Sequence, residues 1–135
     1  MKKNLVSSFK VGDQLFPILS TIAIIQGKWT LHVLRVLLSG KKRFGEIMSA
    51  TGINPKTLSS RLKEMEEAGL LKREFFQEVP PRVEYTLTAK GGELGDLINS
   101  MSLWGERWKK ENDEFFRRKE APPKQPPKND FMFID

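Results

Sequence analysis

Basic side chains are concentrated in one short stretch of this sequence. Residues 41–63 contain six basic residues and one acid, Glu46, so the stretch carries a formal charge of +5, against +6 for the whole chain of 135 residues. The six are Lys41, Lys42, Arg43, Lys56, Arg61 and Lys63. Because ammonium and guanidinium groups neutralise phosphates, this density predicts a polyanionic partner, in agreement with a sequence pI of about 9.7.

Small polar side chains are interleaved with the second half of this stretch. They are Asn54, Thr57, Ser59 and Ser60. Amide and hydroxyl groups can donate to and accept from the base edges exposed in the major groove of DNA. On an isolated helix, such a set of side chains would indicate only a solvent-exposed face. Whether it indicates DNA binding depends on the elements around the helix.

A helix beginning at Asn54 is predicted to position these side chains. Asn54 can cap the helix, and Pro55 can take the first helical position, where its missing N–H costs nothing. The helix would end at 68–69, and its buried stripe, at i, i+4 and i+7, would be formed by Leu58, Leu62 and Met65. The polar and basic side chains lie off this stripe, towards the leading end.

The trailing end of the same helix is acidic. Its carboxylates, Glu64, Glu66 and Glu67, would repel phosphate, whereas a helix N-terminus carries partial positive charge and free N–H groups. The N-terminal end is therefore predicted to face a duplex. Arg61 could pair with Glu64 or a neighbouring carboxylate instead of a phosphate.

Three helices are predicted upstream of residue 54. Apolar runs at 15–25 and 29–38 each close on a glycine, and a short helical pattern at 45–50 ends at Thr51–Gly52 with Ile47 facing inward. In the second helix, the face predicted to be buried contains Leu31, Leu34 and Leu38, with Val33 and Leu37 beside them. The short helix, the turn and the helix from residue 54 form a helix-turn-helix.

A two-stranded hairpin is predicted after the helix-turn-helix. Residues 71–77 and 83–87 alternate as strands do, with Val83, Tyr85 and Leu87 on one face, and 78–82 connect them. Two prolines stiffen the tip beside Arg82. That arginine could be held towards the minor groove of a duplex, or it could pair with Glu84 or Glu78.

A long final helix, capped by Thr88, completes the predicted fold. A narrow apolar stripe at 3-4-3-4 spacing is formed by Leu94, Leu97, Met101, Trp104 and Trp108. The stripe could cover the domain's own core. However, two tryptophans on so narrow a stripe provide more apolar surface than one small domain needs to cover its core. An interface with a second copy is therefore the preferred prediction.

The predicted fold is a winged helix-turn-helix, mainly α (α+β), with flanking dimerisation helices. The domain would span 14–117, after an arm at 1–13 and before a proline-rich tail at 118–135. Phosphate contacts are expected from Lys41, Lys42, Arg43 and Lys63, and base contacts from Lys56, Thr57, Ser59 and Ser60, near the cap Asn54. Arg43 could instead cap the wing.

Several function classes are excluded by what the sequence lacks. The absence of cysteine excludes disulfides, thiolate nucleophiles and cysteine-ligated zinc. His32 lies on an apolar helix without companion ligands, the glycines at 91–95 lack dinucleotide-binding spacing, and no P-loop or nucleophile elbow is present. No enzyme, cofactor or metal is therefore predicted. The run at 15–25 is too short to span a bilayer and precedes no cleavage site, so a cytoplasmic location without membrane attachment is expected.

Several segments together resemble the HxlR family of transcriptional regulators. The resemblance extends over about residues 14–110, and the matching segments are 27–30, 33–34, 37–38, 43–47, 58–66, 69–71 and 80–88 with Gly91. It implies a homodimeric regulator that binds a pseudo-palindromic operator in double-stranded DNA. The recognition helix would be 54–69 in the major groove, and the wing tip would be 80–82. Dimerisation would use the first and last helices, adding Leu15, Ile18 and Ile22 to the interface.

The sequence also departs from that family. Many members have a cysteine before the proline that opens the first helix, and here Phe16 precedes Pro17. Thiol-based sensing is therefore not implied. An aromatic-lined seam between two copies could hold an unidentified small-molecule effector.

A protein-interaction module is the alternative function. It would recruit a partner through the face of Trp104 and Trp108 and through the apolar end at 131–134, which is otherwise an ordinary terminal tail.

Overall fold

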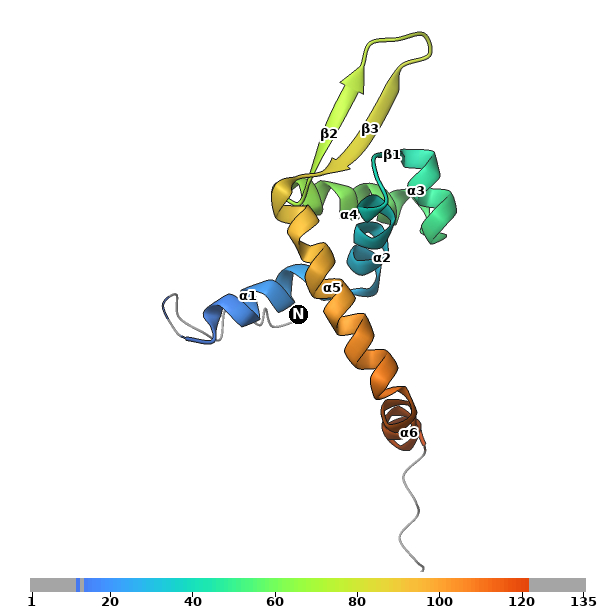
Figure 1. Cartoon of the computed structure of the whole chain (residues 1–135). Coiled ribbons are helices and arrows are strands. Elements are labelled where there is room, and N and C mark those ends of the chain that lie inside the picture. The colour runs from blue at the N-terminus through green and yellow to red at the C-terminus, as the bar shows by residue number, and fades with distance from the viewer. Residues whose placement is uncertain (1–11, 13, 122–135) are drawn as a thin grey trace, which may run out of the picture. The chain divides into compact units, whose positions relative to one another are not determined.

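The computed structural model describes residues 12 and 14–121 (Figure 1). Their contacts form two compact units that divide between Leu97 and Ile98. The elements are α1 (Phe16–Ile25), α2 (Lys28–Leu38), β1 (Lys42–Arg43), α3 (Phe44–Thr51), α4 (Pro55–Glu67), β2 (Leu71–Phe76), β3 (Arg82–Leu87), α5 (Ala89–Arg107) and α6 (Lys109–Glu120). The division falls within α5. None of the described helices is both long and apolar enough to cross a membrane.

The sheet has three antiparallel strands in the order β1-β3-β2. The predicted hairpin of two strands is present as β2 and β3. A third strand that the sequence did not predict, β1, pairs with the outer side of β3, Lys42 opposite Tyr85 and Arg43 opposite Glu84. A two-residue strand is too short to show an alternating pattern in the sequence. Two of the residues expected to bind phosphate therefore belong to the sheet.

The core of the first unit lies between α2, α3, α4 and the base of the hairpin. The predicted stripe of α4 is confirmed, since Leu58, Leu62 and Met65 are buried, and so is Ile47 of α3. The predicted face of α2 is shifted, because Val33, Leu34 and Leu37 are buried whereas Leu31 is half-buried and Leu38 is 40% exposed. The apolar arc of this helix lies opposite Lys28, His32 and Arg35, and Val33, Leu34 and Leu37 lie near its centre whereas Leu31 and Leu38 lie at one margin.

Both ends of α4 have the predicted signals. The Asn54 Oδ1 atom accepts a hydrogen bond of 2.9 Å from the Thr57 N–H, and Pro55 occupies the first turn. At the other end Gly69 adopts a left-handed conformation with φ of +77°. This lets the N–H groups of Gly69 and Leu70 donate to the last carbonyls of the helix, Glu66 O and Met65 O.

The predicted final helix begins as expected and ends early. Thr88 Oγ1 caps α5 by accepting from the Gly91 N–H at 3.1 Å. The helix ends at Arg107, however, and Trp108 lies at the junction with α6, with φ of −106° and ψ of 19°. The prediction that Trp108 continues the stripe within one helix is therefore wrong. Gly105, a poor helix former, lies in the last turn before this junction.

Candidate nucleic-acid interface

The outer face of α4 presents the polar side chains singled out in the sequence. Lys56, Ser59, Ser60 and Lys63 are exposed, and their i, i+3, i+4 and i+7 spacing places them on one side of the helix. The buried stripe occupies the opposite side. Thr57 is half-buried, and its backbone N–H serves the cap. The fold thus fixes one face of α4 in the core and leaves a polar, basic face in solvent.

Charge along α4 runs from positive to negative, as predicted. The first turn contains no acid, so nothing on the helix offsets the partial positive charge of its N-terminus. At the trailing end, Arg61 Nη1 lies 2.8 Å from Glu64 Oε2, which is the ion pair that the sequence suggests as the alternative to a phosphate contact. Glu66 and Glu67 remain exposed beyond it.

A groove separates α4 from one face of the hairpin. Its lining residues are Phe44, Ser59, Leu62, Lys63, Glu66, Glu67, Arg73, Val83 and Tyr85. Arg73 is paired with Tyr85 across the hairpin, and cross-strand partners project to the same face of a sheet. Arg73 therefore lies on the hairpin wall of the groove, while Ser59 and Lys63 line its helix wall.

Arg73 is the basic residue of this region that the sequence analysis missed. The alternation of β3 places Val83, Tyr85 and Leu87 on one face, and their partners in β2 are Phe75, Arg73 and Leu71. This pattern could have placed Arg73 on the same face as Tyr85. Reading that signal requires the register of the hairpin, which depends on where the turn falls.

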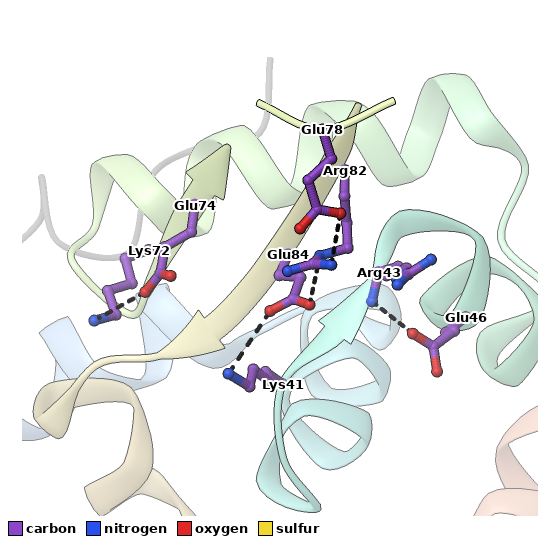
Figure 2. A network of polar contacts seen from close by, with 8 residues as sticks. All are labelled: Lys41, Arg43, Glu46, Lys72, Glu74, Glu78, Arg82 and Glu84. Atoms are coloured by element: carbon purple, nitrogen blue, oxygen red, sulfur yellow. Dashed lines mark hydrogen bonds and ion pairs between the residues drawn. The ribbon is translucent and has the colours of Figure 1, made fainter. Parts of the chain in front are cut away.

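Arg82 lies on the opposite face of the hairpin and is held there by acids (Figure 2). Its Nη1 donates to Glu78 Oε2 at 2.9 Å, and its Nε lies 3.0 Å from Glu84 Oε1 without hydrogen-bond alignment. The guanidinium also stacks over the Phe76 ring, 4.2 Å from its centroid. Of the two alternatives, the structure shows the ion pair. Contact of Arg82 with a minor groove stays a prediction.

Of the basic residues at 41–43, only Lys41 contacts this network. Lys41 Nζ lies 3.8 Å from Glu84 Oε2, a loose contact from a side chain that is mostly in solvent. The Arg43 backbone N–H donates to Glu46 Oε1 at 3.0 Å at the start of α3, and the Arg43 side chain is exposed (Figure 2). Lys42 is half-buried on the Tyr85 face of the sheet.

Metal-binding constellations are absent from the described part of the chain, where no three acids or histidines come together as ligands. His32 is exposed, and its ring centroid lies 5.9 Å from that of Trp29. The region around α4 and the hairpin offers helix-face donors and cations, which suit a polyanion.

Comparison with known families shows to which family this chain belongs. The family model described as HxlR-like helix-turn-helix matches residues 24–114. The chain belongs to the HxlR-like family. The resemblance stated from the sequence is thereby confirmed.

Relatives of this HxlR-like protein match it over most of its length. It is 38% identical over 101 residues to the HTH-type transcriptional regulator sll1512 of Synechocystis, covering 74% of each chain. It is also 38% identical over 109 residues to the HTH-type regulator YdeP of Bacillus subtilis, covering 80% of this chain and 85% of the relative.

Solved structures support the same assignment. A regulator ascribed to the MarR family from Enterococcus faecalis is 42% identical, with a TM-score of 0.68, over 78% of this chain and 97% of that one. The redox regulator HypR in its reduced form is 34% identical, with a TM-score of 0.68, over 73% of this chain and 98% of its own. The HxlR-like protein is thus a winged-helix, DNA-binding transcriptional regulator, and this class is not enzymatic.

The HxlR-like chain exposes apolar side chains in both of its units. In the first, Leu15, Ile18, Ile22 and Leu97 are exposed and Leu94 is half-buried, Ile18 being 58% exposed. In the second, Met101, Trp104 and Trp108 are exposed, Trp104 again at 58%. These are the residues predicted to contact a second copy. The apolar residues at 131–134 lie outside the described part of the chain.

Proposed function

We propose that this HxlR-like regulator binds an operator sequence-specifically as a homodimer, with α4 in the major groove of each half-site. The observation that carries the proposal is the exposed face of Lys56, Ser59, Ser60 and Lys63, which lies opposite a buried stripe. A recognition helix needs both sides, since one must anchor the helix on its domain and the other must reach base edges.

The contacts divide into two chemical groups under this proposal. Lys56, Thr57, Ser59 and Ser60 read bases near the N-terminus of α4, beside its cap Asn54. Phosphates are neutralised by Lys41, Lys42, Arg43 and Lys63. This division is supported by the exposure of Lys56 and Lys63 and by the acid-free first turn of the helix.

A second copy is proposed to cover the exposed apolar side chains of α1 and α5 and of Leu15 and Trp108, which flank these helices. Leu15, Ile18, Ile22 and Leu97 are large residues left in solvent by the single chain, as are Met101, Trp104 and Trp108. Two recognition helices about one helical turn apart, ~34 Å, would then meet the two halves of a pseudo-palindromic site.

Regulation by a small molecule in an apolar seam between the copies is part of this proposal, as is a cytoplasmic location beside the DNA that is regulated. HypR is described as a redox regulator. Because the present chain contains no cysteine, we do not extend a thiol switch to it.

In vitro selection from a random duplex library, followed by anisotropy titrations across salt, tests the proposal. Wild-type protein should enrich a motif with two half-sites. Lys56→Ala should reduce the ratio of specific to nonspecific affinity about tenfold, because a lost base contact is worth ~1–3 kcal/mol. Lys63→Ala should weaken binding to all duplexes alike and lower the salt slope by about 1.

Lys72→Ala is the matched control, because Lys72 lies on the hairpin face away from the α4 groove and pairs with Glu74 at 3.3 Å. Equal behaviour of the Lys56 and Lys63 variants would contradict the proposed division of contacts. If Lys56→Glu preserved regulation in cells while Trp104→Ala abolished it, the protein-interaction module would be the correct function.

A further inference from the structure

The end of α4 is fastened to the start of α5 by two side chains. Thr88 Oγ1 donates to the Gly69 carbonyl oxygen at 2.5 Å while it accepts from the Gly91 N–H. Lys90 Nζ donates to the Ala68 carbonyl oxygen at 2.7 Å. The carbonyl of the C-cap Ala68 has no partner within α4, and Gly69 follows it, so Lys90 and Thr88 satisfy carbonyl groups at the end of α4 and just beyond it.

The two backbones also touch at this place. The Thr88 N–H donates to the Leu70 carbonyl oxygen at 3.0 Å, and the same oxygen occupies the space where a Cβ of residue 91 would stand. Only glycine fits at position 91 unless the backbone moves. One turn further along α5, a Cβ at Gly95 would lie 2.8 Å from Leu38 Cδ2 of α2. Figure 1 shows the first turns of α5 beginning beside the end of α4.

These contacts, all within the first unit, join two elements with different proposed tasks. α4 carries the base-reading face, and α5 carries Leu94 and Leu97, which belong to the surface assigned to a second copy. Lys90 is exposed and contributes nothing to the apolar core. Its Cδ packs near Gly69, at 3.7 Å from the position of a Cβ there. Its contacts serve to fix one helix against the other.

We propose that Thr88, Lys90 and Gly91, here named the α4–α5 joint, determine which spacing of half-sites the dimer accepts. The inference rests on the proposed function, because spacing has meaning only for two copies on one duplex. In a symmetric dimer, the distance and rotation between the recognition helices follow from the angle between each of them and its dimerisation helix. The joint fixes the angle between α4 and α5 where the two helices meet. Its members touch no DNA and are positioning residues.

The test compares full-length wild type with Lys90→Met, which keeps the apolar stem and removes the ammonium group, and with Thr88→Val. Each protein is used in selection from random duplexes and then titrated on duplexes that carry the selected half-sites at the native spacing and with one or two base pairs added. Lys72→Met is the matched control, because this lysine is also exposed and its ammonium group pairs with Glu74 rather than with the joint.

Wild type and Lys72→Met should lose at least about tenfold in affinity on the lengthened sites, the size of a base-pair mismatch. The joint variants should select the same half-sites, with a broader range of spacings, and should discriminate less than about threefold between native and lengthened sites. Gly91→Ala should shift the preferred spacing or fail to fold, and the Lys90 variant keeps the test valid in the second case.

Three results overturn the inference. The joint variants could retain the wild-type spacing preference, which would leave the joint without this role. They could lose affinity for every duplex together with a lower Tm, which would make the joint a source of stability only. If wild type enriches no paired motif, the proposed function itself fails, and this outcome is recognised before any variant is made.

Discussion

The two arginines of the hairpin, Arg73 and Arg82, have the same charge and opposite surroundings. Arg82 is held by Glu78 and Glu84 and stacks on Phe76, and its side chain is only 25% exposed. Arg73 projects from the other face into the groove beside α4, and no ion pair within the described residues involves it. Basic residues counted in a sequence are therefore not equally available to a polyanion, since neighbouring carboxylates compete for them.

The largest expected effect comes from removing the arginine that is already paired. Arg82→Ala would leave Glu84, a largely buried carboxylate, without its close counterion and would expose the Phe76 ring. The free energy of unfolding should fall by about 1–3 kcal/mol, measured by urea denaturation. Combining Arg82→Ala with Glu84→Gln should restore part of this loss. Unchanged stability together with a large loss of DNA affinity would show instead that Arg82 acts on the duplex.

Arg73→Ala should show the reverse pattern. Stability should change by less than about 0.5 kcal/mol, because the side chain is exposed and contributes little to packing. Affinity for all duplexes should fall about three- to tenfold, with a decrease of about 1 in the salt slope. Arg73→Lys should retain most of the affinity, because it preserves the charge. Normal DNA binding by Arg73→Ala would show that the groove does not face a phosphate backbone.

The smallest effect is expected for Lys72, a pair partner on the outer face of the hairpin. Its contact with Glu74, at 3.3 Å between exposed groups, should contribute less than about 0.5 kcal/mol. Lys72→Ala should also change DNA affinity by less than about twofold. A larger loss of affinity would mean that the Arg82 face of the hairpin meets the duplex, and the comparison between the two arginines would then have to be reversed.

Signals that act over a few residues were predicted correctly from the sequence. The cap by Asn54, the proline after it, and the stripe Leu58, Leu62 and Met65 depend on local hydrogen bonds and on helical period, and the structure confirms all of them. The ion pair between Arg61 and Glu64 is equally local.

Features that depend on tertiary pairing were missed. β1 is too short for periodicity, and it exists because β3 offers a free edge opposite Lys42 and Arg43. The position of Arg73 follows from the register of the hairpin. The interruption at Trp108 concerns backbone angles, which an apolar stripe does not report. The contacts of the candidate site with DNA stay predictions.

The exposed isoleucines of α1 have a consequence for how this regulator responds to its own abundance. If a second copy covers Ile18 and Ile22, the concentration of dimer rises with the square of the chain concentration when copies are few. Promoter occupancy would then have a threshold, and a modest change in synthesis or degradation would change gene expression more than proportionally. The concentration of the protein would then regulate its own activity, through dimerisation of its apolar surface and without any ligand.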